Sequence, residues 1–285
     1  MMVIVIAGPT ASGKSQIALQ LAKDINGVII NGDSRQVYKE LQIGTARPIE
    51  SEFENIPNYL YGHVSVKKKY NIYQYQKDVK EVFKNIPSER VAIIVGGTGL
   101  YIDSVIYNYI LTENREDNHK ENLDDISVEQ LHSMIDPNLL NQLNESDIVN
   151  PVRLRRIVEK QGNEHKKGEP LKHLYFVIDI PKEQLHRNIE TRVSEMFSKG
   201  LVEENKMIRE KGLEKYSALH TIGYQEFDRY FSETKTLADI KSEIIRNTKK
   251  YAKRQKTWFR RNKNTVWTNN YDLILESSTK FIKTE

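Results

Sequence analysis

A phosphate-binding motif lies close to the start of the chain. Residues 8–15 fit the P-loop pattern Gly-x-x-x-x-Gly-Lys-Ser/Thr. The backbone N–H groups of such a loop, together with the positive end of the helix that follows, surround an anion. Lys14 adds a positive charge, and the Ser15 hydroxyl suits a Mg²⁺ ion carried by the phosphates. The motif predicts a di- or triphosphate site formed by Gly8, Pro9, Thr10, Ala11, Ser12, Gly13, Lys14 and Ser15.

Polar residues follow a second short apolar run, 28–30. Ligands of open α/β sheets bind beyond the carboxyl ends of the strands, which is where these residues would lie. One interpretation makes Asp33 a general base, with its neighbours Ser34, Arg35 and Gln36 holding an acceptor. The other makes Asp33 or Ser34 the N-cap of a helix. The stretch alone leaves both open.

A glycine-rich turn, 96–99, follows the apolar run 91–95. Many P-loop ATPases carry an acidic residue at the end of such a strand, and no carboxylate follows here, which argues against an ordinary ATPase. Glycines would let the backbone and Thr98 approach a substrate closely, although a tight turn before a helix would use the same residues. Farther along, Arg192 lies beside the apolar stripe of a predicted helix. It is either a phosphate-neutralising arginine or an ion-paired surface residue.

The apolar runs that precede these motifs predict the fold. Residues 3–7, 28–30, 91–95 and 174–180 are short, apolar and rich in β-branched side chains, as buried parallel strands are. Helical periodicity lies between them, so we expect an α/β protein with a P-loop-type parallel sheet flanked by helices. Residues 112–167 change in composition and predict a small all-helical insertion into a core of 1–111 and 168–285.

Two helices could bind a polyanion. In the insertion, Asn150, Arg153 and Arg156 are three residues apart and share a helix face. This face predicts either a surface that binds a nucleic-acid backbone or a flipped base, or a solvated, salt-bridged surface. The segment 246–263 holds nine Lys/Arg and no Asp/Glu. Subtracting that +9 from the net charge of +4 leaves −5 for the rest of the chain. Basicity concentrated in one C-terminal helix predicts contact with a nucleic-acid backbone.

Composition sets further expectations. Hydrophobic residues make up 38% of the 285, enough for a sizeable core. The absence of cysteine excludes disulfides and thiolate metal sites, and the seven histidines lack metal-ligand spacing, so we expect no structural metal. No apolar run reaches the ~18 residues that a membrane span needs. We expect a cytoplasmic monomer without a signal peptide.

Seven motifs in a fixed order resemble the bacterial tRNA dimethylallyltransferases, the tRNA isopentenyltransferase family. They are GPTASGKS (8–15), DSRQVY (33–38), GTARP (44–48), GGTGLY (96–101), DIVNPVRLRR (147–156), IGYQE (222–226) and YAKRQKTWFR (251–260). The P-loop is shared with many enzymes, whereas the combination of the other six is specific.

The resemblance implies transfer of a dimethylallyl group from its diphosphate to the exocyclic amine of the adenosine 3′ of the tRNA anticodon, position 37. Asp33 would be the base, Thr98 would help to position the amine or a bridging oxygen, and Lys14, Arg192 and Ser15 with Mg²⁺ would stabilise the departing diphosphate. The P-loop then becomes a leaving-group site. The anticodon stem-loop would contact Asp33, Ser34, Arg35, Gln36, Thr98, Val152, Arg153, Leu154, Arg155, Arg156, Gly223, Tyr224, Lys250, Lys253 and Arg254.

Two other classes of protein remain open on the residues alone. A P-loop kinase for a nucleoside or other small molecule would place ATP on residues 8–15 and an acceptor hydroxyl near Asp33, but leaves the basic helix unexplained. A non-catalytic RNA-binding module would explain the basic helix but not the polar residues at the strand ends.

Overall fold

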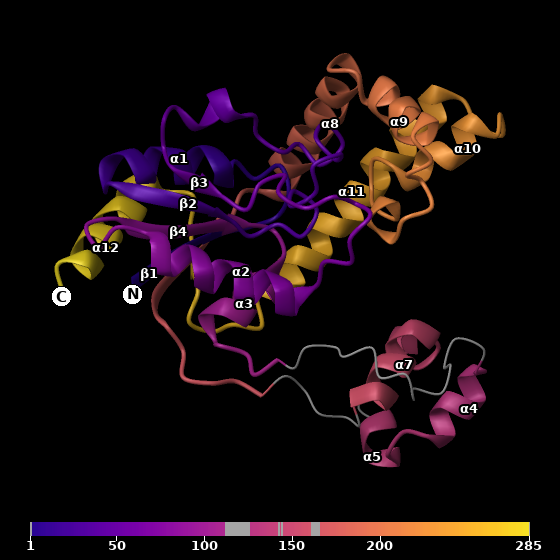
Figure 1. The fold of residues 1–285 in the computed structure, drawn as a ribbon, viewed down its shortest axis with the longest axis horizontal. Coiled ribbons are helices and arrows are strands. Elements are labelled where there is room, and N and C mark those ends of the chain that lie inside the picture. Colours follow the sequence, from indigo (N-terminus) through magenta and orange to yellow (C-terminus); the bar gives the residue numbers. More distant parts are fainter. Residues whose placement is uncertain (1, 112–125, 142, 144, 161–165, 285) are drawn as a thin grey trace. The chain divides into compact units, whose positions relative to one another are not determined.

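The computed structural model describes residues 2–111, 126–141, 143, 145–160 and 166–284, with only the backbone described at 146, 156, 159 and 160. The chain divides into two compact units (Figure 1). The first comprises Met1–Asn108 and Pro170–Glu285, and the second comprises Tyr109–Glu169. In the described parts of the chain, no helix is long and apolar enough to cross a bilayer.

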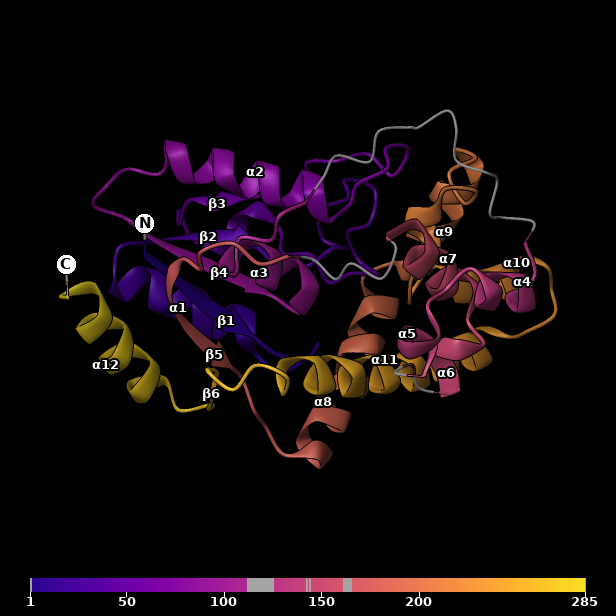
Figure 2. The same cartoon turned by 90° about the horizontal axis from the view of Figure 1, so that it is seen from below.

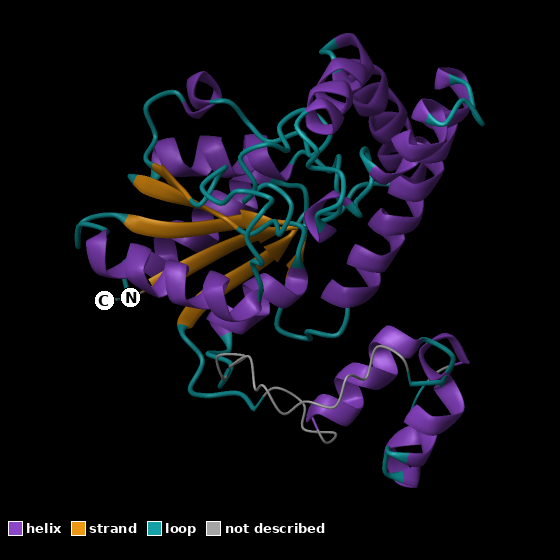
Figure 3. Ribbon diagram, turned by 45° about the vertical axis from the view of Figure 1, so that its right-hand side comes forward, coloured by secondary structure: helices purple, strands orange, loops and turns teal. Residues whose placement is uncertain are grey.

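The larger unit is built on a six-stranded sheet in the order β3-β2-β4-β1-β5-β6. Every neighbouring pair is parallel, so the carboxyl ends of all strands meet at one edge, where the loops gather (Figure 3). The strands are β1 (Met2–Ala7), β2 (Gly27–Asn31), β3 (Asn58–Tyr59), β4 (Val91–Gly96), β5 (Lys172–Val177) and β6 (Val266–Trp267).

The central strands are apolar on both sides because helices cover both faces of the sheet (Figure 2). On one face, Val3, Val5 and neighbouring strand residues pack against α2 (Ile72–Asn85) and α3 (Gly99–Ile106). On the other, Ile4 and Ile6 pack against α1 (Lys14–Asp24) and α12 (Tyr271–Ile282). Alternate residues of β1 therefore belong to two separate cores, which fixes the register of this strand.

A helical layer lies beyond the carboxyl edge of the sheet. It comprises α8 (Lys182–Ser198), α9 (Leu201–Glu210), α10 (Asp228–Phe231) and α11 (Leu237–Phe259), with the 3₁₀ turns η3 (Ser217–Leu219) and η4 (Gln225–Phe227). Ile189 and Val193 of α8 pack with Ile240 and Ile244 of α11. A further 3₁₀ turn, η1 (Glu50–Phe53), precedes β3. The helix α11 begins with a capping box in which Thr236 and Asp239 bond to each other's backbone N–H groups.

The named elements of the smaller unit are helices, and an isolated antiparallel bridge joins Tyr109 to Lys167. Its helices are α4 (Val128–Ser133), α5 (Pro137–Leu140), α6 (Glu145–Ile148) and α7 (Pro151–Lys160). Leu131, Ile135 and Leu154 form its buried core. The charged stretch 112–125 lies outside the described residues.

The predicted class, a P-loop-type parallel sheet flanked by helices with a small helical insertion, is confirmed. The apolar runs 3–7, 28–30 and 91–95 all lie within strands.

Candidate active site

The P-loop joins the end of β1 to the start of α1. Gly8 and Gly13 have φ of 153° and 88°, backbone conformations that residues with a Cβ rarely adopt. Gly13 caps α1, so the first-turn N–H groups of that helix face the loop. Ser12 is buried, with only 5% of the residue exposed, and among the described residues its hydroxyl has no hydrogen-bond partner. The loop therefore holds an unsatisfied donor as well as a helix N-terminus.

Two cations converge on this loop. The Lys14 Nζ lies 3.4 Å from the Pro9 carbonyl oxygen, and Arg192 of α8 donates to the Thr10 hydroxyl at 3.3 Å. Burial and, to a smaller extent, the Arg192 charge lower the pKa of Lys14 to about 8, while the Asp33 charge opposes the change. The pKa of Arg192 is also lowered, chiefly by burial. Two desolvated cations beside one another are unfavourable, and a bound anion would relieve both.

Asp33 lies in a turn beyond β2 whose geometry is fixed by backbone contacts. The Asn31 side chain accepts from the Asp33 N–H at 2.9 Å and donates to the Asp33 and Leu60 carbonyls at 3.0 Å. The Asp33 Oδ1 accepts from the Arg35 N–H at 2.9 Å, so Asp33 stabilises a turn, and no helix begins there. The helix N-cap interpretation is therefore wrong. One carboxylate oxygen is used in this bond, and Asp33 is half-buried.

The glycine turn after β4 contacts the Asp33 turn directly. The Ser34 N–H donates to the Thr98 hydroxyl oxygen at 3.0 Å, and that hydroxyl lies 3.2 Å from the Ser34 Oγ. A Cβ at Gly96 would lie 2.1 Å from the Gly32 carbonyl carbon, so only glycine permits this approach. Asp33, Ser34 and Thr98 thus form one polar wall.

Tyrosines surround this wall. Burial raises the pKa of Tyr61, Tyr75, Tyr101 and Tyr251, and the Asp33 charge raises each further. Tyr75 donates to the Asn31 carbonyl at 2.9 Å and stacks on Tyr101 with centroids 4.6 Å apart. Because Tyr75 is completely buried, it belongs to the core, and its bond to Asn31 stabilises the carboxyl end of β2.

The helix α11 presents different residues on its two sides. The Thr98 side chain lowers the pKa of Tyr251 against the larger, opposite effect of burial, so these two side chains interact. The Gln255 amide bonds to the backbone of the P-loop and to that of the glycine turn. Neither residue was predicted as part of the site. Gln255 could have been noticed because it is a polar residue at a buried position of the helix, between Ala252 and Phe259.

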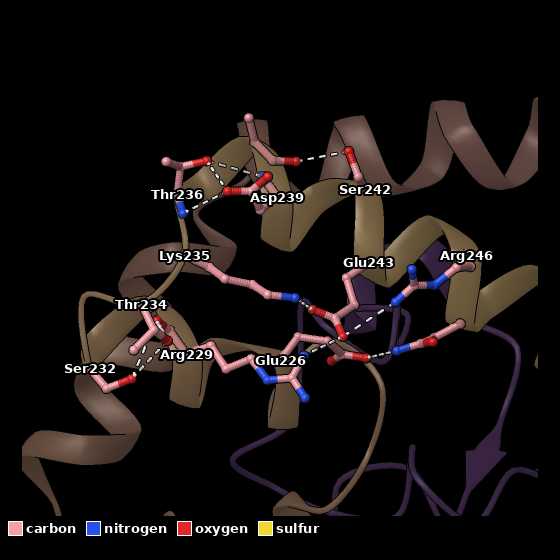
Figure 4. Close-up of polar contacts among 12 residues, drawn as sticks. Glu226, Arg229, Ser232, Thr234, Lys235, Thr236, Asp239, Ser242, Glu243 and Arg246 are labelled. Carbon is pink, nitrogen blue, oxygen red and sulfur yellow. Dashed lines mark hydrogen bonds and ion pairs between the residues drawn. The ribbon is translucent and has the colours of Figure 1, made fainter.

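The opposite side of α11 is less basic than its composition indicated. Lys249 pairs with Glu190 of α8, and Lys256 pairs with Asp179. Glu243 accepts from Arg246, Arg229 and Lys235, so Arg246 belongs to a cluster that ties α11 to the preceding turn (Figure 4). In the part of the chain that the structure describes, Lys250, Lys253 and Arg254 are exposed with no acidic partner.

Two other residues predicted to contact tRNA, Gly223 and Tyr224, lie inside the larger unit. Tyr224 is 3% exposed, and its hydroxyl donates to the buried carboxylate of Glu204 at 2.7 Å. Glu204 also accepts from the N–H groups of residues 42–44, which immobilises the start of the 44–48 motif. Gly223 has φ of 92°, and its N–H donates to Glu226. These residues support a loop, and any RNA contact by Tyr224 would be indirect.

The predicted tRNA residues of the smaller unit lie on α7. Val152 is 53% exposed, and the Arg153 Nε lies 3.0 Å from the Asp147 carboxylate. Leu154 is completely buried in the core of this unit, and Arg155 is half-buried. The side chain of Arg156 lies outside the described residues.

Two more predicted residues lie in the larger unit. Ser15 is exposed. Gln36 is half-buried and donates to the carbonyls of residues 45 and 46.

Known proteins resemble the chain over most of its length. A family model described as IPP transferase matches residues 36–262. The tRNA dimethylallyltransferase of Anoxybacillus flavithermus is 36% identical over 277 residues, covering 93% of this chain and 89% of that protein. The enzyme of the same name from Carboxydothermus hydrogenoformans is 36% identical, with 99% and 96% covered.

Solved structures agree. The tRNA isopentenylpyrophosphate transferase of Staphylococcus epidermidis superposes with a TM-score of 0.74 at 30% identity, covering 100% of this chain and 99% of that one. A eukaryotic dimethylallyltransferase described as acting on tRNA gives 0.77 at 26% identity, covering 90% of this chain and 69% of that one. The resemblance predicted from the seven motifs is confirmed, and the chain belongs to the IPP transferase family.

Proposed function

We propose that this protein transfers the dimethylallyl group of dimethylallyl diphosphate to the exocyclic amine of the adenosine just 3′ of the anticodon in tRNA. The relatives named as tRNA dimethylallyltransferases support the reaction type. The observation that carries the proposal is the convergence of Lys14 and Arg192 on the P-loop, with Asp33 close enough to influence the pKa of both. An anion site and a carboxylate side by side suit a reaction that releases diphosphate and removes a proton.

The P-loop would hold the diphosphate of the donor. The first-turn N–H groups of α1 and the Ser12 hydroxyl are the donors, and Lys14 and Arg192 neutralise charge. As the carbon–oxygen bond breaks, negative charge grows on the departing diphosphate. Fixed donors and cations that face this charge stabilise the transition state more than the ground state.

The acceptor amine would lie at the wall formed by Asp33, Ser34 and Thr98. An adenine amine is a weak nucleophile, because its lone pair is delocalised into the ring. As the nitrogen–carbon bond forms and the carbon–oxygen bond breaks, the amine proton passes to the free oxygen of Asp33. Thr98, held by Ser34, would position the amine. General-base assistance contributes on the order of 10²–10⁴-fold.

A magnesium ion fits this donor set. Ser15 presents an exposed hydroxyl in the first turn of α1, next to Lys14. Across the described residues no three His, Asp or Glu side chains form a metal cluster, so the chain would hold the ion through Ser15 and the diphosphate oxygens would complete its shell. The ion would supply further charge neutralisation for the departing diphosphate.

The anticodon stem-loop would bind the exposed cations of α11, Lys250, Lys253 and Arg254. These side chains lie on the helix that also carries Tyr251 and Gln255, so phosphate contacts would place the flipped base near the site. Unstacking the base costs a few kcal/mol, and the phosphate contacts would offset it. In the smaller unit, Val152, Arg153, Arg155 and Arg156 remain predicted contacts. We expect a cytoplasmic monomer.

The test of this function is a transfer assay with purified protein, dimethylallyl diphosphate, Mg²⁺ and an anticodon stem-loop, without ATP. Mass spectrometry should find one added C5H8 unit on the target adenosine. A stem-loop with inosine in place of that adenosine is the matched control, because it lacks the amine, and it should gain nothing. Phosphate transfer from ATP to a small acceptor, with no C5H8 gain, would instead support the kinase alternative.

The tRNA surface is tested by reversing two charges. The double variant Lys250→Glu, Lys253→Glu should bind the stem-loop at least ~10-fold more weakly and reduce the slope of log K against log salt by about two. The control Lys280→Glu, Lys283→Glu makes the same change at the end of α12 and at its C-cap. Equal losses in both variants, or unchanged binding in the first, would exclude α11 as the RNA surface.

A further inference from the structure

Gln255 connects two loops that are distant in sequence. Its Oε1 accepts from the Thr10 N–H in the P-loop at 2.9 Å, and its Nε2 donates to the Gly97 carbonyl in the glycine turn at 2.9 Å. The residue is 4% exposed. A buried amide whose two ends each bond to a backbone group has one orientation, because a flip would place two donors together and two acceptors together.

The two loops and Gln255 are packed without spare space. A Cβ at Gly97 would lie 2.2 Å from the Gln255 Nε2 and 3.4 Å from the Gly8 carbonyl oxygen. Thr10 is held at two of its polar groups, its N–H by Gln255 and its hydroxyl by Arg192. The separation between P-loop and glycine turn is therefore set by the length of one glutamine side chain.

The neighbouring residues of α11 make no bond that joins the two loops. Tyr251, one turn earlier, interacts with Thr98 of the glycine turn, whose side chain lowers the Tyr251 pKa against the effect of burial. Trp258, almost one turn later, donates to the Asp103 carboxylate at 2.8 Å. Both help to fix the helix, but neither of these bonds spans the two loops.

We propose that Gln255 is a positioning residue that sets the distance between the diphosphate cradle and the acceptor wall without contacting either substrate. The proposal rests on the proposed function, in which donor and acceptor occupy those two loops. Reacting atoms must approach to ~3–3.5 Å in line, and a misplacement of ~1 Å can lower the rate about 10²-fold. Gln255 therefore acts on the transfer step, while each loop keeps its own binding groups.

The test compares Gln255→Met with the wild-type protein. Methionine has a similar length and no polar end, so both bonds are lost. We expect kcat to fall about 10–100-fold, while KM for the donor and the Kd for the stem-loop stay within about threefold. Amide hydrogen exchange at Thr10 should accelerate, which is a readout independent of activity. Trp258→Phe is the structural control: it removes the bond from α11 to Asp103, keeps an aromatic ring beside Gly99 and leaves both Gln255 bonds in place, and its kcat should stay within about threefold of wild type.

Gln255→Glu supplies a second, pH-dependent test. Either ionisation state accepts from Thr10, but only the protonated carboxyl can donate to the Gly97 carbonyl. The ratio of its kcat to that of the wild type should rise as the pH is lowered from 8 to 6. A residue with a merely structural role would give a ratio independent of pH.

The outcomes separate the two levels of the account. A wild-type protein that transfers no dimethylallyl group refutes the proposed function. An active wild type with a Gln255→Met kcat within threefold, or with a Gln255→Glu ratio that stays flat, overturns the positioning role alone. Unchanged exchange at Thr10 in Gln255→Met would also overturn it.

Discussion

Donor binding should be accompanied by proton uptake at Lys14. Burial and the Arg192 charge lower the pKa of this lysine to about 8 in the free protein. A bound diphosphate places at least two negative charges beside it and should return the pKa toward its ordinary value. The protonated form binds the anion, so the free protein must take up the missing proton.

The size of the effect follows from that pKa. The deprotonated fraction of Lys14 is about 0.1 at pH 7, 0.5 at pH 8 and 0.9 at pH 9, and these are the protons taken up per donor bound. The apparent Kd should rise about tenfold between pH 7 and 9. The donor phosphate, with a pKa near 6, is fully ionised from pH 8 to 9 and adds nothing there.

Isothermal titration calorimetry measures this uptake directly. A non-reactive thio analogue of the donor is titrated at each pH in two buffers that differ in their heat of protonation. Lys14→Arg is the matched control, because arginine keeps its charge up to high pH and should show no uptake. Absence of uptake in the wild type at pH 8–9, or the same uptake in Lys14→Arg, would refute the reasoning.

Three further predictions concern stability and the packing around the site. Lys14→Met should abolish donor binding. It should also raise the free energy of unfolding at pH 7 by on the order of 1–3 kcal/mol, because folding lowers the lysine pKa from 10.5 to about 8. In urea titrations of the wild type, the free energy of unfolding should rise with pH between about 8 and 10.5, where the unfolded chain binds more protons. Glu204→Gln should cost about 2–4 kcal/mol in the same assay because an amide cannot accept from all the donors around it, whereas the exposed neighbour variant Glu203→Gln should change stability by less than about 0.5 kcal/mol. Gly99→Ala should lower the thermal midpoint and shift the tryptophan emission, since a Cβ there would lie 2.0 Å from the Trp258 ring; an unchanged spectrum and midpoint would contradict the packing.

The sequence was most informative where a local pattern has a local cause. The P-loop spacing predicts its own conformation, because Gly8 and Gly13 adopt backbone angles that other residues avoid. The apolar runs predict buried parallel strands because both faces of the sheet are covered. These features need no knowledge of which segments meet in space.

Properties that depend on distant partners were not predictable in the same way. The count of nine cations in 246–263 is correct, but Glu190 and Asp179 pair with Lys249 and Lys256 from other elements. Gln255 has no motif of its own, and its partners are 245 and 158 residues away in sequence. Tyr224 belongs to a specific motif, yet in the structure it is buried and its hydroxyl accepts from the N–H of residue 44.

The central claim, a diphosphate cradle and a base on adjoining loops, is tested most directly by single-turnover transfer with Asp33→Asn. Asparagine keeps an oxygen that can accept from the Arg35 N–H, so the turn should be preserved while the base is lost. With donor and stem-loop saturating at pH 7, we expect the rate of C5H8 transfer to fall about 10²–10⁴-fold with the Kd for the stem-loop within about threefold of wild type. A single-turnover rate within threefold of the wild type would contradict the account.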